Sequence, residues 1–252
     1  MAERPPRDAP LTRAARRALL AGAAAGGLLA GCAAPVPSAG GGRQAPVPRL
    51  RIGDRWRYLV TERPRDLLID QPTLTVAAIQ PDLVVRIAGR AGAPLGTEER
   101  FASPWAVLQE TIYGETVRYD SAVPLVPLPL GAGDGATTVT TWRSPDDGRP
   151  RRWTQRLSVG GWETVEVPAG RYECLRVDRV IGFEHADRNR GASTRTDRLW
   201  YAPQVARWVR REWRGEYTSA GLTQGSPAEG IRGDEGWIVW ELSAWLPAPV
   251  SG

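Results

Sequence analysis

The stretch LRIGDRWRYLVT, residues 50–61, sets the pattern from which the fold can be predicted. After a turn signal at Gly53-Asp54, large apolar side chains alternate with arginines. Trp56, Tyr58 and Val60 fall on one face of an extended chain, and the arginines fall on the other. A period of two is typical of a β-strand with one buried face. We therefore expect the folded body to open here with a strand.

Similar runs, separated by Pro, Gly and Asp turn signals, continue to the end of the chain. No window after Cys32 shows the 3.6-residue apolar period of a helix. The sequence predicts an all-β, mainly antiparallel fold of about 10–12 strands, either a curved sheet, an open barrel or a sandwich. The expected strands are 50–61, 73–79, 83–88, 107–112, 116–119, 137–142, 152–159, 162–167, 171–183, 193–201, 205–217 and 237–245. The proline-rich residues 123–130 are expected to be an extended crossover, and residues 218–235 an exposed loop.

A short internal sequence repeat suggests that the body consists of two related halves. LRIGD at residues 50–54 and LGAGD at residues 130–134 share Leu, Gly and Asp at the same spacing, and a β-rich run follows each. The halves would be residues 50–122 and 126–246.

The N-terminal segment has the pattern of a secretory signal. Arg13, Arg16 and Arg17 precede an apolar run from Ala18 to Ala30, and small residues follow it. The run is too short to span a bilayer, which needs about 20 apolar residues. We expect residues 1–31 to be a signal helix that is removed.

Leu29-Ala30-Gly31-Cys32 resembles the lipobox of bacterial lipoproteins. The resemblance implies cleavage between Gly31 and Cys32 and attachment of palmitate-type acyl chains to Cys32, which would anchor the protein in a membrane. Ala33, in place of the Asp that retains such proteins at the inner membrane, favours the outer membrane, facing the periplasm. Both the general secretory route and the twin-arginine route remain open.

The rest of the chain divides by composition into a tether, a body and a tail. Residues 32–49 are rich in Pro and Gly and are expected to be a disordered tether. Residues 50–246 form the β-rich body, and residues 247–252 form a tail. Without the signal, the formal charge falls from +5 to about +2, which argues against a nucleic-acid partner.

Three phrases of the body are similar to the TapB-like group of β-rich envelope proteins of unknown function. They are GDRWRY at residues 53–58, VPAGRY at 167–172 and LWYAP at 199–203. The resemblance implies a curved antiparallel sheet or open barrel in the bacterial cell envelope. It implies no catalytic residue.

The chain offers little for catalysis. Its one histidine, His185, lies in a polar stretch and is expected on a surface loop, and Cys174 sits in a strand-like run and is expected to be buried and inert. We find no metal-ligand set, no phosphate- or dinucleotide-binding motif and no nucleophile motif, and we expect no cofactor. The protein is therefore expected not to be an enzyme.

Eleven tryptophans point instead to binding or packing. We expect most of them to be core residues and the Arg/Trp run at 207–214 to be guanidinium groups stacked on rings. The aromatic residues that could face a ligand are Trp56, Tyr58, Trp200 and Trp208. The first hypothesis is non-enzymatic binding of an apolar or amphipathic ligand such as lipid. The alternatives are a structural partner in an envelope complex and a carboxylate-dependent glycan hydrolase.

Overall fold

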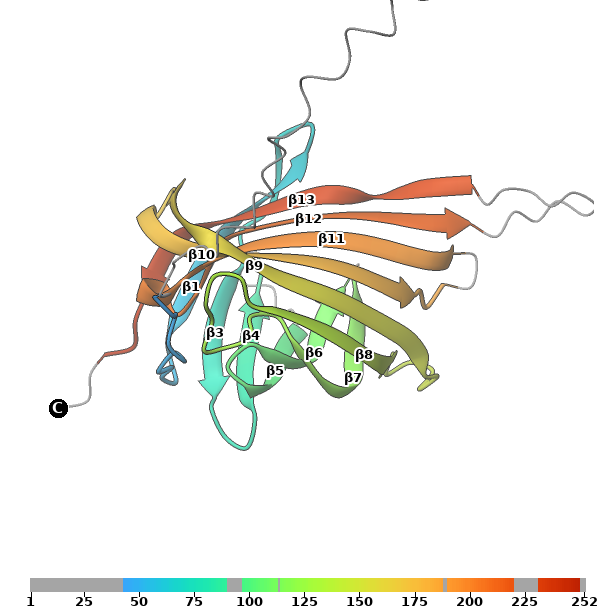
Figure 1. Ribbon diagram of the computed structural model, residues 1–252, viewed down its shortest axis with the longest axis horizontal. Coiled ribbons are helices and arrows are strands. Elements are labelled where there is room, and N and C mark those ends of the chain that lie inside the picture. The colour runs from blue at the N-terminus through green and yellow to red at the C-terminus, as the bar shows by residue number, and fades with distance from the viewer. Residues whose placement is uncertain (1–42, 90–96, 113, 188–189, 220–230, 250–252) are drawn as a thin grey trace, which may run out of the picture. The chain divides into compact units, whose positions relative to one another are not determined.

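The computed structural model describes residues 43–89, 97–112, 114–187, 190–219 and 231–249 (Figure 1). The chain divides into two compact units, Met1–Ala39 and Gly40–Gly252, and all described residues belong to the second. The expected signal peptide, the cleavage site between Gly31 and Cys32, and the lipidation of Cys32 lie outside the described residues. Within those residues, none of the helical structure is both long and apolar enough to cross a membrane.

The body is all-β, as the sequence predicts. The strands are β1 (Arg55–Arg63), β2 (Leu67–Asp70), β3 (Thr73–Ala78), β4 (Leu83–Ala88), β5 (Thr97–Ser103), β6 (Ala106–Ile112), β7 (Glu115–Pro124), β8 (Gly135–Arg143), β9 (Arg151–Val167), β10 (Gly170–Glu184), β11 (Arg190–Ala202), β12 (Arg207–Ser219) and β13 (Ile231–Leu246). A 3-10 turn, η2 (Pro203–Val205), joins β11 to β12.

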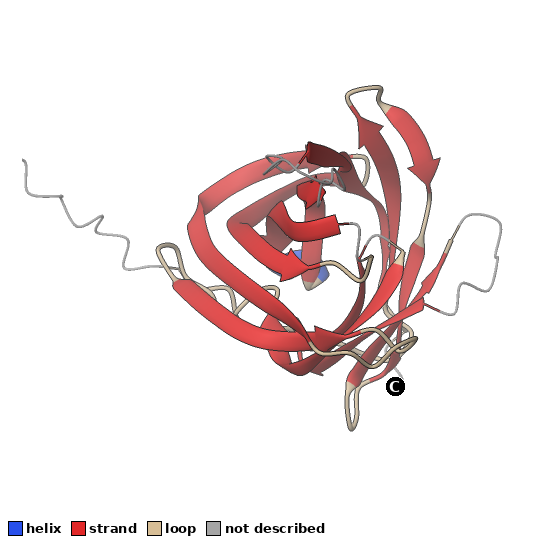
Figure 2. Cartoon of the chain, turned by 90° about the vertical axis from the view of Figure 1, so that its right-hand side faces the viewer, coloured by secondary structure: helices blue, strands red, loops and turns tan. Residues whose placement is uncertain are grey.

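The strands form one antiparallel sheet that closes into a barrel (Figure 2). The first strand pairs with the last, from Arg55 opposite Leu246 to Arg63 opposite Trp237. Twelve strands make the wall of the barrel. The extra strand, β2, pairs with residues 60–62 of β1, beyond residues 55–57, which pair with β3. Of the predicted arrangements the barrel is therefore the correct one, and it is closed rather than open.

Alternation along β1 is as predicted. Trp56, Tyr58 and Val60 are buried in the barrel, and Arg55 and Arg57 are exposed. This agreement follows from the geometry of a barrel, where successive side chains point inward and outward.

Two expected strands are in fact one. The sequence predicts separate strands at residues 152–159 and 162–167, but β9 runs unbroken through Gly160 and Gly161 between them. The partner strand β10 absorbs the irregularity with a register shift between Leu175 and Val177. A Cβ atom on Gly160 would lie 3.1 Å from Nε of Arg176, so this glycine makes room for the arginine side chain.

Other boundaries also differ from the prediction. Both β2 and β5 were missed, and β7 extends to Pro124 at the start of the proline-rich run. The predicted loop 218–235 is shorter, because β12 continues to Ser219 and β13 begins at Ile231.

The repeated segments LRIGD (residues 50–54) and LGAGD (residues 130–134) form two turns with equivalent hydrogen bonds. The Asp54 carboxylate accepts from the N–H of Arg51 at 2.8 Å, and the Asp134 carboxylate accepts from the N–H of Gly131 at 2.7 Å. The backbone of each turn also bonds to a later strand, to Val76 of β3 in the first case and to Val159 of β9 in the second.

The two turns differ in burial, which predicts different costs of mutation. Asp54 is buried and also accepts from the N–H of Ala248, whereas Asp134 is exposed. Asp54→Ala should lower the free energy of unfolding by about 1–3 kcal/mol, because two N–H groups lose their acceptor away from water. Asp134→Ala should cost less than about 1 kcal/mol, because water can replace the carboxylate. Urea denaturation followed by tryptophan fluorescence measures both, and equal losses would contradict the comparison.

The chain enters and leaves the body at one end of the barrel, which we call the base. Ala45 pairs through its backbone with Leu130, and the carbonyl of Arg43 accepts from Trp162 Nε1 at 2.9 Å. Ala248 bonds to Asp54 at the same end. The last residues of the segment predicted as a tether thus contact the barrel.

Candidate functional site

The inside of the barrel near the base is filled by tryptophans. Trp105 lies at the centre, with ring centroids 6.1 Å from Trp56, 5.5 Å from Trp208 and 5.3 Å from Phe101, each in an edge-to-face arrangement. All four rings are buried. Edge-to-face contacts of this kind add to the free energy gained by burying the rings.

The guanidinium group of Arg207 is enclosed in this aromatic cluster. The Cζ atom of Arg207 lies 3.7 Å from the ring centroid of Trp208, 4.7 Å from that of Trp105 and 5.2 Å from that of Trp56. Its Nη2 donates to Glu99 Oε2 at 2.7 Å. Ring faces attract a cation, and the carboxylate balances its charge. This is the ring and guanidinium stacking expected from residues 207–214.

Tyr58 links the aromatic cluster to the backbone of β12 by a hydrogen bond. Its hydroxyl donates to the carbonyl oxygen of Trp208 at 2.7 Å, and burial raises the pKa of this hydroxyl well above its usual value. Trp56 Nε1 likewise donates to the carbonyl of Val205 at 2.8 Å. The aromatic cluster is therefore fixed by hydrogen bonds as well as by packing.

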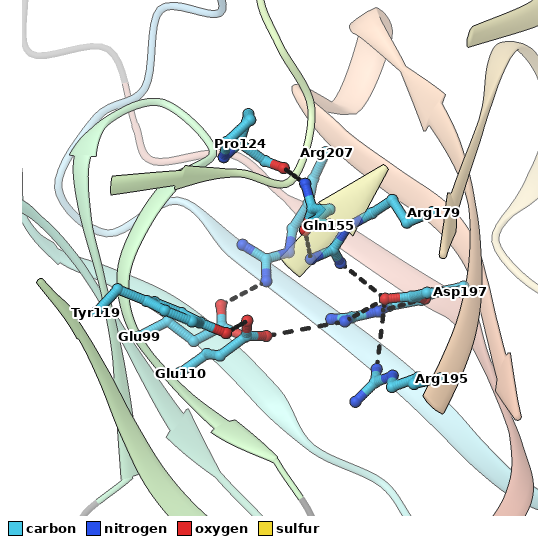
Figure 3. Close-up of polar contacts among 10 residues, drawn as sticks. Glu99, Glu110, Tyr119, Pro124, Gln155, Arg179, Arg195, Asp197 and Arg207 are labelled. Carbon is cyan, nitrogen blue, oxygen red and sulfur yellow. Dashed lines mark hydrogen bonds and ion pairs between the residues drawn. The ribbon is translucent and has the colours of Figure 1, made fainter. Parts of the chain in front are cut away.

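Further inside the barrel, Asp197 is surrounded by three arginines (Figure 3). Its Oδ2 accepts from Arg211 at 2.7 Å, from Arg179 at 2.8 Å and from Arg195 at 3.4 Å. Burial by itself would raise the pKa of Asp197, but the three positive charges outweigh burial and hold the pKa well below its usual range. Asp197 thus stays ionised and cannot serve as a general acid near neutral pH.

The network extends to the opposite wall of the barrel (Figure 3). Glu110 of β6 lies 3.8 Å from Arg211 of β12 and accepts from the hydroxyl of Tyr119 at 2.8 Å. Gln155 of β9 accepts from Arg179 and donates to the carbonyl of Pro124 at 2.6 Å. These contacts link strands that are far apart in the wall. We interpret the network as structural, because its members are bound to one another.

The opposite end of the barrel, which we call the mouth, holds a second polar group. Glu235 Oε1 accepts from Arg190 Nη1 at 3.1 Å and lies 4.0 Å from Nε2 of His185. The guanidinium of Arg190 stacks on Tyr217 at 4.6 Å. The Glu235 side chain is 1% exposed, and its Oε2 has no hydrogen-bond partner among the described residues.

A cavity of about 580 Å³ opens beside this group. It lies where the turn after β1 meets β13 and is lined by both apolar and charged side chains. The lining residues that bear on binding are Arg63, Pro64, Arg65, Arg190, Glu235 and Trp237.

His185 is not the surface residue that the sequence predicts. It does lie outside the strands, but its side chain is only 9% exposed and its ring lies against Phe183 at 6.2 Å. Burial lowers the pKa of His185 below its usual 6.5, although Glu235 acts in the opposite direction.

The lowered pKa of His185 predicts a loss of stability on acidification. The unfolded chain binds the proton more readily, so stability falls as the pH drops through 6.5. Because the chain has one histidine, little else titrates between pH 7 and about pH 5.5. The free energy of unfolding should fall by no more than about 1 kcal/mol over this range, and His185→Asn should abolish the slope. A variant that keeps the wild-type slope in urea denaturation would contradict this assignment.

The four aromatic residues proposed from the sequence do not form one site. Trp56, Tyr58 and Trp208 meet in the aromatic cluster, where protein covers them. Trp200 lies on the outer face of the barrel, where its Nε1 donates to Glu163 at 2.5 Å and Arg210 stacks on its ring at 5.2 Å.

Sequence reasoning missed the charged residues of the interior and the mouth. In β11, Arg195 and Asp197 have the same parity as the buried Leu199 and Tyr201, so alternation places them inside. No similar signal marks Glu235, which lies in a segment predicted to be a loop.

Cys174 is buried, as predicted. Burial is the main cause that raises the pKa of its thiol to about 12, and the nearby Glu163 and Glu173 add to the effect. The thiol is therefore protonated and unreactive at neutral pH. Among the described residues, no cluster of His, Cys, Asp and Glu has the makings of a metal site.

No protein family and no curated protein matches the chain, so the resemblance to the TapB-like group stays a prediction. Three solved structures are similar in fold. An exported-protein candidate with a YmcC-like fold from Bacteroides fragilis is 15% identical over 80% of this chain and 99% of its own, with a TM-score of 0.48. A lipoprotein candidate from Parabacteroides distasonis is 10% identical (81% and 100% covered, TM-score 0.44), and the hypothetical lipoprotein YmcC from Escherichia coli is 9% identical (79% and 86%, TM-score 0.43). All three TM-scores lie below 0.5, so the site rests on this chain's own residues.

Proposed function

We propose that the protein is an exported bacterial lipoprotein, anchored through acyl chains on Cys32 in the outer membrane and facing the periplasm. The charged start, the short apolar run and the sequence Leu29-Ala30-Gly31-Cys32 support this proposal. Cells labelled with radioactive palmitate should give a labelled wild-type band and an unlabelled Cys32→Ser band. An unlabelled wild-type band would overturn the anchor.

We further propose that the protein acts by binding rather than by catalysis, and that an amphipathic ligand binds in the cavity at the mouth. The observation that carries this proposal is the Glu235 carboxylate, which is buried beside the cavity and whose Oε2 has no partner in the part of the chain that the structure describes. A buried acceptor without a donor is costly, and a ligand that donates a hydrogen bond removes that cost.

The lining of the cavity suits an amphipathic molecule. Trp237 and Pro64 offer apolar surface, while Arg65, Arg190 and Glu235 offer charges of both signs. A hydroxyl or ammonium group of the ligand would donate to Glu235, and its apolar part would lie against Trp237. This proposal places the ligand at the mouth rather than on the aromatic cluster, whose rings are covered.

Native mass spectrometry of the mature chain, purified from membranes in mild detergent, tests the proposal. The wild type should carry an adduct of lipid mass that is lost on denaturation. Glu235→Gln should lose most of this adduct, whereas Glu216→Gln, on an exposed residue of β12, should keep it. An adduct of equal occupancy in both variants would place the ligand elsewhere.

A second candidate function, docking to an envelope protein, is favoured by β2. This short strand pairs only with β1 among the described strands, and its Leu67, Leu68 and Ile69 are exposed. An exposed apolar edge strand can pair with a strand of another protein. A photocrosslinker at Leu68 should then capture one defined envelope protein, and a matched probe at Val139 on β8 should not.

A further inference from the structure

The segment that leads into the base of the barrel is strongly basic. Residues 43–57 contain five arginines and a single acid, Asp54. All five guanidinium-bearing residues are exposed: Arg43, Arg49, Arg51, Arg55 and Arg57.

Asp54, the one acid of residues 43–57, does not pair with the exposed arginines of this segment. Asp54 is buried, and its two carboxylate oxygens accept from the backbone N–H groups of Arg51 and Ala248, both at 2.8 Å. Its charge stabilises the turn from within the barrel. The arginines around it therefore face solvent as a group of like charges.

Exposed apolar side chains lie among these arginines. Ile52 is 61% exposed and Val47 is 49% exposed, and Ile79, in the turn after β3, is 46% exposed. The loop that carries Ile52 is joined to β3 by hydrogen bonds between Gly53 and Val76 and between Val76 and Asp54, each of 2.9 Å. The base thus presents apolar and basic groups together, which is the combination that binds at the surface of an anionic bilayer.

Chain length brings this surface close to a membrane. Arg43 follows Cys32 by 11 residues. Eleven residues span at most about 40 Å, even when fully extended. An anchor at Cys32 would therefore hold the base within reach of the headgroups.

We propose that the base of the barrel is a membrane-docking surface that binds anionic phospholipid headgroups through Arg49, Arg51 and Arg55 and inserts Ile52 among them. The proposal rests on the lipid anchor of the proposed function. It also orients the barrel, with the base on the membrane and the mouth directed away from it.

Fluorescent labelling of the mature protein in vesicles tests this surface. The variants Ile52→Cys and Val139→Cys carry the same polarity-sensitive dye. Val139, which is 65% exposed on β8, is the matched control on the wall of the barrel. Cys174 should not react, because burial keeps its thiol protonated. The protein is inserted by its own anchor into phosphatidylcholine vesicles with or without phosphatidylglycerol.

The dye at residue 52 should shift to the blue when phosphatidylglycerol is present, and the dye at residue 139 should not. Replacing Arg49, Arg51 and Arg55 together by Gln should remove the shift at residue 52. Equal spectra at residue 52 in both vesicle types would overturn the docking surface.

The mass of the purified chain separates this outcome from a failure of the anchor. An acylated chain with an unchanged dye at residue 52 refutes the docking surface alone, whereas a chain without acyl groups refutes the anchor. In the second case flotation with anionic vesicles still tests the surface. Binding that is lost in the triple Gln variant supports the surface, and no binding by the unacylated protein overturns it.

Discussion

Asp197→Asn should lower the free energy of unfolding by about 3–5 kcal/mol, because it leaves three buried guanidinium groups without their shared counter-charge. Asp197 and Arg179 have no exposed side-chain surface, and Arg195 and Arg211 are nearly as buried. Asparagine keeps the shape of the side chain, so the loss reports on charge rather than on a cavity. Glu110 lies 3.8 Å from Arg211, farther than Asp197 at 2.7 Å, so it replaces the lost charge only in part.

Urea denaturation at pH 7 measures this loss, with Asp120→Asn as the matched control. Asp120 makes an ion pair with Arg143 at 3.1 Å, but both side chains are more than 40% exposed, so this change should cost less than about 1 kcal/mol. Similar losses in the two variants would show that Asp197 does not hold the interior together. Because its pKa is lowered, the contribution of Asp197 is complete above the unfolded pKa of 3.8 and is lost as the pH falls below it.

Glu99→Gln should cost a similar amount, about 3–5 kcal/mol, because Arg207 then remains charged among tryptophan rings without a carboxylate. The double variant Glu99→Gln/Arg207→Met should recover most of this loss, to within about 2 kcal/mol of wild type. Methionine fills the space of the arginine stem and needs no counter-charge, and apolar replacement of a buried ion pair is often neutral.

A double-mutant cycle in urea gives the coupling between Glu99 and Arg207 directly. We expect Arg207→Met alone to cost less than Glu99→Gln alone, because Glu99 keeps some contact with solvent. Additive losses in the double variant would mean that the two side chains do not interact as the 2.7 Å contact implies.

The charged network has a consequence for the fold as a whole. Glu99 on β5 and Glu110 on β6 bind Arg207 and Arg211 on β12, on the opposite side of the barrel. A buried ion pair adds little net stability, but removing one partner is strongly destabilising because it leaves a buried charge without a counter-charge. The network therefore favours one register of the closed barrel over its alternatives.

Local alternation explains why most of the strands could be predicted. Trp56, Tyr58 and Val60 repeat every second residue because each strand has one side inside the barrel. Closure could not be predicted in the same way. The pairing of β1 with β13 joins residues at opposite ends of the body, and a local pattern carries no information on such a contact.

The functional residues were harder to predict for a different reason. Charged side chains are usually solvated, so Arg195 and Asp197 were not assigned to the interior despite their parity with Leu199. Glu99 and Glu110 meet their arginines across the barrel, and sequence spacing does not encode that contact. Glu235 becomes recognisable only when β13 brings it beside Arg190 and His185.

The proposed ligand at the mouth, beside Glu235, can be tested with an experimental structure of the protein, isolated with its bound molecules from the envelope. We predict electron density for an amphipathic molecule in the cavity, with a donor atom within hydrogen-bond distance of Glu235 Oε2 and with the aromatic cluster closed. Ligand density among Trp56, Trp105 and Trp208, with the mouth holding only water, would contradict it.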